Sequence, residues 1–104
     1  MEEASRSPDE NRKAERVLMT LTQTGSVSNY AAKFRREAAK LALGDKYPMM
    51  RFYHGLKDDV KDILVMEDRP DTLEAYIERA IRIDNALYQR RQEKKERKRM
   101  NPRS

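Results

Sequence analysis

Residues 23–41 read QTGSVSNYAAKFRREAAKL, and this stretch contains one helix end followed directly by a second helix. Gly25 is expected to end the first helix, and the Ser26 side chain is expected to cap the second. Charged residues of the segment lie largely away from its apolar face, so we expect an amphipathic helix packed against other helices. The apolar positions that share this face are Val27, Tyr30, Ala31, Phe34, Ala38 and Leu41.

The segment before this stretch predicts another helix. Residues 7–10 (SPDE) supply a Ser N-cap, a Pro at the first helical position and two acidic side chains in the first turn. The helix is expected to run to about Gln23. Its apolar stripe follows the spacing i, i+3, i+4, i+7 and consists of Ala14, Val17, Leu18 and Leu21.

Two shorter helices are predicted after Leu41. Gly44-Asp45 ends the preceding helix and begins the next, in which Pro48 is acceptable because the first turn has no intrahelical N–H bond to lose. Gly55 predicts a tight exit or a close contact between helices. Asp58 is expected to cap a brief fourth helix that stops before Arg69-Pro70. The two apolar stripes are Met49, Phe52, Tyr53 and Leu56, then Val60, Ile63 and Leu64.

The last predicted helix has the longest apolar face. Residues 71–74 (DTLE) follow the acceptor-x-x-Glu pattern of a capping box and predict its start. From about Arg90 the apolar positions end, so the helix either continues into solvent or frays, and Asn101-Pro102 ends any remaining order. The face itself comprises Leu73, Tyr76, Ile77, Ala80, Ile83 and Leu87.

Every segment therefore predicts helix, and none shows the period-two alternation of a strand. A chain of 104 residues, 38% of them hydrophobic, suffices for one small domain. We expect an all-α fold, a small orthogonal bundle of about five helices joined by short connections. The expected organisation is a disordered N-terminal extension at residues 1–8, a helical domain at residues 9–89 and a basic tail, frayed or disordered, at residues 90–104.

Charge is unevenly distributed along the chain. Residues 90–104 carry eight Lys and Arg against two Glu, a net of +6, which leaves −1 for the rest of a chain whose total is +5. The basicity therefore belongs to the tail and does not indicate a basic face on the helical domain.

Catalytic and metal sites find little support in the sequence. The chain has no Cys, which excludes disulfides, thiolate ligands and Cys nucleophiles. His54 is the only His, so neither a His-paired nucleophile nor a two-His metal site can form within one chain. Asp58, Asp59 and Asp62 lie at a helix start, where a role complementing the helix dipole outweighs a metal site. No phosphate-binding Gly motif occurs, and we expect no enzyme activity, no cofactor and no metal.

A membrane or secreted location is not supported either. The apolar runs are far shorter than the ~20 residues that a spanning helix needs, and the N-terminus lacks the features of a secretory signal. We therefore expect a soluble, cytoplasmic protein with no membrane partner and no small-molecule substrate.

Several short elements occur in a fixed order along the chain: a Gln-x-Gly-Ser-Val turn at residues 23–27, Tyr30 and Phe34, FYHGLK at residues 52–57, Pro70 before Thr72-Leu73, and IRID at residues 81–84. This order resembles the capsid C-terminal domain of Gag polyproteins from Ty3/Gypsy-type LTR retrotransposons, over roughly residues 17–92. The resemblance implies a fold like that of retroviral capsid C-terminal domains, and self-association rather than catalysis.

The resemblance also implies a structural role for the first of these elements. The segment is similar to a loose counterpart of the major homology region of retroviral capsids, although the acidic residue usual in that region is missing here. A hydrogen-bond network centred on that acidic residue is therefore not expected. The residues assigned to this turn and its core are Gln23, Gly25, Tyr30 and Phe34.

A homodimer contact is expected on the helix that follows. In capsid C-terminal domains of the retroviral type, the corresponding helix commonly supplies the dimer contact. Met49 and Met50 are adjacent, so they cannot both point into the same core, and an exposed one could serve either at the edge of the core or in a protein contact. We expect Met49, Met50 and Tyr53 to form the pairing surface, with higher assembly into virus-like particles together with an N-terminal capsid lobe.

Two other functions remain open. The basic tail predicts salt-dependent, sequence-independent RNA binding, or it is a solvated linker. A helical adaptor that binds a host peptide is the other alternative, since the chain resembles the C-terminal capsid lobe alone, either as a fragment or as a domesticated derivative. The expected nucleic-acid contacts are Arg90, Arg91, Lys94, Lys95, Arg97, Lys98 and Arg99.

Overall fold

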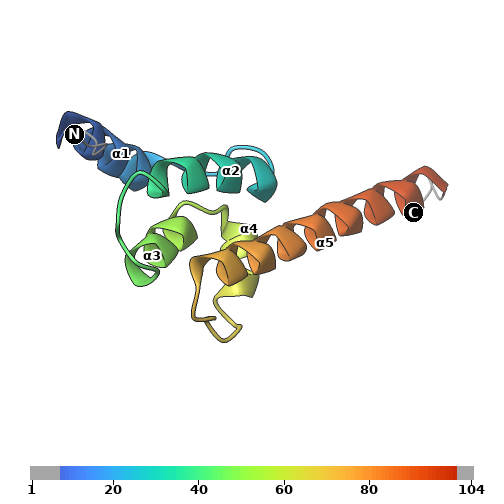
Figure 1. Ribbon diagram of the computed structural model, residues 1–104. Coiled ribbons are helices and arrows are strands. Elements are labelled where there is room, and N and C mark those ends of the chain that lie inside the picture. Colours follow the sequence, from blue (N-terminus) through green and yellow to red (C-terminus); the bar gives the residue numbers. More distant parts are fainter. Residues whose placement is uncertain (1–7, 101–104) are drawn as a thin grey trace.

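Figure 1 shows the computed structural model, which describes residues 8–100 and the side chains of residues 11–99. Residues 8–100 form five α-helices and no strand. The predicted all-α fold, a bundle of about five helices, is confirmed. The helices are α1 (Pro8–Thr20), α2 (Val27–Ala38), α3 (Lys46–His54), α4 (Asp58–Leu64) and α5 (Leu73–Met100).

The helices pack around one core. Helices α2, α3 and α5 contact one another, α1 packs on α2 and α3, and α4 packs on α5. Every predicted apolar stripe contributes side chains to the interior, so the helices bury their apolar faces against one another. The buried apolar side chains are Ala14, Leu18, Val27, Tyr30, Ala31, Phe34, Met49, Phe52, Leu56, Val60, Leu64, Tyr76, Ile77, Ala80 and Ile83.

Two helix ends differ from the prediction. Helix α1 ends at Thr20 rather than at about Gln23, because the Gln23 N–H donates to the Gly55 carbonyl (2.7 Å) instead of continuing the helix. Helix α2 ends at Ala38, and Leu41 packs against the core from the turn that follows. Gly44 in the same connection has a φ of +69°, a left-handed conformation that favours Gly.

The start of α5 is capped from two directions. The Thr72 hydroxyl accepts a hydrogen bond from the Ala75 N–H (3.2 Å), so Thr72, and not Asp71, occupies the capping position. The Asp45 carboxylate accepts from the Leu73 N–H (3.0 Å). The prediction that Asp45 begins α3 is therefore incomplete: it precedes α3 without a side-chain cap bond there, and its carboxylate is used at α5.

Caps at the other helices follow the sequence in part. The Ser26 hydroxyl accepts from the Asn29 N–H (3.1 Å), which confirms Ser26 as the cap of α2. The prediction that Asp58 caps α4 is wrong, because Asp58 is already the first helical residue and the preceding Lys57 makes no side-chain cap bond. Pro48 lies in the first turn of α3, as expected.

Helix α5 continues past the predicted boundary at Gln89. Its 28 residues correspond to about 42 Å of helix, and its second half extends away from the other helices (Figure 1). Ile83 is the last buried residue, and every side chain from Tyr88 to Arg99 is exposed. We call residues 88–100 the α5 projection. Of the alternatives for the basic tail, the structure shows a continuing helix as far as Met100.

The remaining predictions for the ends of the chain fall largely outside the described part. Ser7, the predicted cap of the first helix, and residues 1–7 of the predicted extension belong there, as do residues 101–104. Pro8 is the first residue of α1, in agreement with the predicted helix start.

Candidate functional site

Gln23 connects the two turns at the centre of the domain. Its side chain is buried, its Nε2 donates to the Gly25 carbonyl (2.9 Å), and its Oε1 accepts from the Lys57 N–H (2.9 Å). Together with the backbone bond to Gly55, these contacts tie the turn before α2 to the turn before α4. We call this arrangement the Gln23 clasp. Because both ends of the amide are paired, the buried polar group is satisfied and its position is fixed.

Gly55, which follows α3, allows a close approach to Tyr30 of α2 and to the backbone at Leu21. A Cβ at this position would lie 2.6 Å from the Leu21 carbonyl oxygen and 2.8 Å from Cζ of Tyr30, and it would also collide with the Tyr30 hydroxyl. That hydroxyl donates to the Phe52 carbonyl (3.0 Å). The close contact predicted for Gly55 is thus present, and the space that Gly leaves empty is occupied by the Tyr30 phenol.

Burial raises the pKa of the Tyr30 phenol well above its ordinary value, and the positive charge of Arg51 opposes this shift only in part. The phenol is therefore neutral and available as a donor throughout the physiological pH range. Its ring stacks on Phe52, with ring centroids 5.0 Å apart. Phe34 meets Phe52 edge to face at 5.4 Å, and Tyr76 adds a tilted contact at 6.3 Å. The core between α2, α3 and α5 is consequently built around four rings.

The structure brings together the residues assigned to the homology-region-like turn. Gln23 and Gly25 form the turn, while Tyr30 and Phe34 enter the adjoining core. The acidic group that contacts the start of α2 comes from elsewhere: the Asp84 carboxylate on α5 accepts from the Val27 N–H (3.0 Å). Sequence reasoning did not find this contact, because the two residues are 57 positions apart.

Of the three residues of α3 predicted to form the pairing surface, one is buried, one is half-buried and one is exposed. Met49 is 2% exposed and lies in the core, so its assignment to that surface is wrong for the folded subunit. Met50 is 40% exposed, and Tyr53 is half-buried with the Lys61 ammonium 5.8 Å from its ring centroid. The outer side of the helix also carries Tyr47, 38% exposed, which the sequence analysis missed although its i, i+3 spacing to Met50 signals a shared face. We call Tyr47, Met50, Tyr53 and His54 the α3 outer face.

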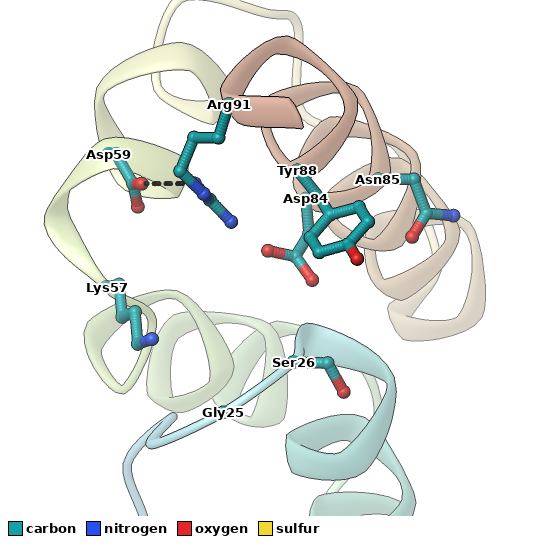
Figure 2. A pocket seen from close by; sticks show the side chains of 8 residues that line it. All are labelled: Gly25, Ser26, Lys57, Asp59, Asp84, Asn85, Tyr88 and Arg91. Carbon is teal, nitrogen blue, oxygen red and sulfur yellow. Dashed lines mark ion pairs between the residues drawn. The ribbon is translucent and has the colours of Figure 1, made fainter. Parts of the chain in front are cut away.

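A recess of about 470 Å³ lies between α5 and the turns that precede α2 and α4 (Figure 2). The Arg91 guanidinium reaches across it to Asp59 of α4 (3.6 Å), and the Tyr88 ring stands on the α5 side (Figure 2). We call this cavity the α5 recess. Its lining residues are Gly25, Ser26, Lys57, Asp59, Asp84, Asn85, Tyr88 and Arg91.

All seven predicted nucleic-acid contacts lie on the α5 projection with exposed side chains. Arg90 pairs with Glu93 (2.7 Å) and Arg99 with Glu96 (3.2 Å), each within the helix. Within the described residues, the other cations of the projection apart from Arg91 make no ion pair: Lys94, Lys95, Arg97 and Lys98. Their role in binding stays a prediction.

Residues 14–87 match the family described as PEG10/RTL1, C-terminal capsid-like domain. The chain belongs to this family. The match includes the whole buried core, from Ala14 to Ile83, and it ends at Leu87, immediately before the α5 projection. None of the curated proteins matches the chain.

The resemblance to a Gag capsid C-terminal domain of the Ty3/Gypsy type is therefore confirmed. The PEG10/RTL1 capsid-like family is structural rather than catalytic, and a Gag-like structural role follows for the chain. Among the side chains that the structure describes, residues 11–99, no group of three or more His, Asp or Glu could hold a metal ion. The helices of the same part of the chain include none long and apolar enough to cross a membrane.

Proposed function

We propose that this capsid-like domain is a self-association module that pairs with a second copy of itself through the α3 outer face and contributes to a Gag-like particle. The observation that supports the proposal is the exposure of apolar and aromatic groups on α3 after the core has formed. Tyr and Met are enriched at the centres of protein interfaces, and both residue types occur here side by side. In this proposal the domain acts in the cytoplasm and performs no catalysis.

A weak contact suffices for such a role. Two copies related by a two-fold axis would place one α3 outer face against the other, so that the same exposed side chains become buried in both copies. A dissociation constant in the micromolar range or weaker is enough when many copies, together with an N-terminal capsid lobe, act in one lattice. Family membership is compatible with this role and equally with a domesticated derivative.

Sedimentation of the full chain over a range of concentrations tests the pairing surface. Met50→Asp places a charge at the centre of the proposed contact and should raise the dissociation constant at least about tenfold, because the charge would be buried without a partner. Met66→Asp is the matched control: Met66 is 85% exposed in the connection after α4, outside the α3 outer face. It should leave self-association unchanged.

Tyr53→Ala gives a second reading of the same surface and should weaken pairing less than Met50→Asp, because the Tyr53 side chain is half-buried within its own subunit. Circular dichroism of each variant establishes that the fold is retained. A wild-type chain that stays monomeric up to about 1 mM would overturn the proposal, as would equal effects of Met50→Asp and Met66→Asp.

A further inference from the structure

The cations of the α5 projection lie on one side of the helix. At 3.6 residues per turn, all seven fall within an arc of about 200°, and Glu93 and Glu96 fall on the remaining side with Gln89 and Gln92. The members of this basic face are Arg90, Arg91, Lys94, Lys95, Arg97, Lys98 and Arg99.

The basic face continues the row of α5 side chains that packs on the domain. Leu87 is the last of these packed residues, and Lys94 and Lys98 follow it on the same side after about two and three turns. The basic face is therefore turned toward the side on which α4 and the turn before α2 lie. Arg91, which reaches Asp59 across the α5 recess, shows this direction (Figure 2).

Lys94 and Lys98, at the centre of the basic face, form no ion pair with any of the described residues. Like charges lie four residues apart in the pairs Arg90–Lys94 and Lys94–Lys98, an arrangement that repels along the helix. The two ion pairs within the projection use Glu93 and Glu96, which lie on the opposite side. A polyanion that binds along the face would remove this repulsion and release counterions.

The α5 recess adds an aromatic group at the base of the basic face. Tyr88 is 58% exposed, and Lys57 and Arg91 line the same cavity (Figure 2). An exposed ring offers a stacking platform for an unpaired base, and the two cations can bind the adjoining phosphates. The volume of about 470 Å³ lies within the range of small-ligand pockets, which is adequate for one nucleotide.

The two carboxylates of the recess are already engaged. Asp84 accepts from the Val27 N–H, and Asp59 pairs with Arg91 at 3.6 Å. The Arg91 and Asp59 side chains are each about half exposed. Replacing the Asp59 carboxylate by a phosphate as the partner of Arg91 therefore costs little free energy.

We propose that the basic face of the α5 projection and the α5 recess together bind single-stranded nucleic acid, with phosphates along the basic face and one unpaired base stacked on Tyr88. This proposal goes beyond self-association and does not depend on it, because the surface lies on α5 and not on α3. An anionic membrane fits less well, since the projection has no apolar side to insert. A duplex offers no unpaired base to the recess.

The first experiment asks whether the face, rather than net charge, determines binding. Fluorescence anisotropy measures the affinity of the full chain for a single-stranded oligouridine RNA at low salt. The double variant Lys94→Glu/Lys98→Glu changes the centre of the basic face, whereas Arg97→Glu/Arg99→Glu changes its two edges with the same change of charge. We expect a loss of at least about tenfold for the first and less than about threefold for the second. Equal losses would overturn the geometric proposal.

The second experiment tests the stacked base. Tyr88→Ala should weaken oligouridine binding about tenfold, while Tyr88→Phe, which keeps the ring, should bind as the wild type does. The loss should be absent for duplex RNA of the same length. If Tyr88→Ala binds as the wild type does, or if duplex RNA or anionic lipid vesicles bind as tightly as the single strand, the proposal is wrong.

The third experiment predicts a gain of affinity. Asp59→Asn removes the carboxylate that holds Arg91 and should strengthen binding about twofold to fivefold. Asp62→Asn makes the same change of charge on the same helix but outside the recess, and it should have a smaller effect. Equal gains would contradict a role for the recess. Met50→Asp should leave RNA binding unchanged, which separates this proposal from the failure of the pairing surface.

Discussion

The family-matched part of the chain, residues 14–87, and the α5 projection differ in the contacts and the exposure of their side chains. In the matched part, one residue has several partners from distant segments: Tyr30 stacks on Phe52, donates to its carbonyl and occupies the space beside Gly55. In the projection every described side chain is exposed, and its contacts are ion pairs at the surface.

The two regions should therefore respond differently to substitution. Changes in the matched part should alter the free energy of unfolding, because they leave cavities, collisions or unpaired buried groups. Changes in the projection should alter charge and binding with little effect on stability. A single helix thus belongs to the folded domain in its first half and to a surface appendage in its second.

The strongest test of this comparison is Gly55→Ala. The added Cβ would collide with the Tyr30 phenol and the Leu21 carbonyl, so we expect a loss of about 3 kcal/mol in the free energy of unfolding, measured with urea. Gly25→Ala is the control, because nothing lies within 4 Å of its Cβ position, and it should cost less than about 1 kcal/mol. Similar losses for both would contradict the collision predicted at Gly55.

A smaller loss is expected from opening the Gln23 clasp. Gln23→Ala removes the bonds to the Gly25 carbonyl and the Lys57 N–H and should cost about 2 kcal/mol. Gln89→Ala, the same substitution at an exposed position of α5, should stay within about 0.5 kcal/mol of the wild type. Urea unfolding of both variants gives the contrast directly, and a stable Gln23→Ala would contradict the structural role of the clasp.

Tyr30→Phe should cost about 1 kcal/mol at neutral pH, since the hydroxyl loses its bond to the Phe52 carbonyl. The pKa of this phenol is raised in the folded state, so its contribution is complete below the unfolded value near 10 and is lost as the pH rises toward the folded value. Thermal unfolding at pH values from about 8 to 11.5 should show that the wild type and Tyr30→Phe become more similar in free energy of unfolding above about pH 10. A difference in stability that stays constant across this pH range would exclude the linkage to the Tyr30 phenol. Tyr88→Phe, the same substitution at an exposed position, serves as the control.

The smallest effect is expected from removing most of the projection. A chain that ends after Gln89 loses the Arg91–Asp59 pair, which is exposed, and should unfold within about 1 kcal/mol of the full chain. Differential scanning calorimetry measures this change. A larger loss of free energy of unfolding would show that the projection stabilises the family-matched part. The stable domain would then extend beyond Gln89.

Much of the fold could be predicted from the sequence, because helical periodicity is a local property. The stripe that contains Phe34 and the one that contains Ile77 were both found from spacing alone, and both residues are fully buried. The site was predictable in part. Gln23 and Gly25 were assigned to one turn, and the spacing already placed Met49 in the apolar stripe with Phe52. The assignment of Met49 to the pairing surface is wrong, because Met49 is buried and only Met50 stays exposed once the helices have packed.

Five helices, their apolar faces, the position of the basic segment and membership of a capsid-like family all follow from the order of the residues. The partners of Gln23, Asp45 and Asp84, the exposure of Met50 and the direction of the basic face depend on how the helices pack. Helix formation involves neighbours within about four residues, so the local sequence specifies it. The contacts of Asp84 with Val27, or of Gln23 with Lys57, join segments far apart in the chain and exist only after the helices have packed.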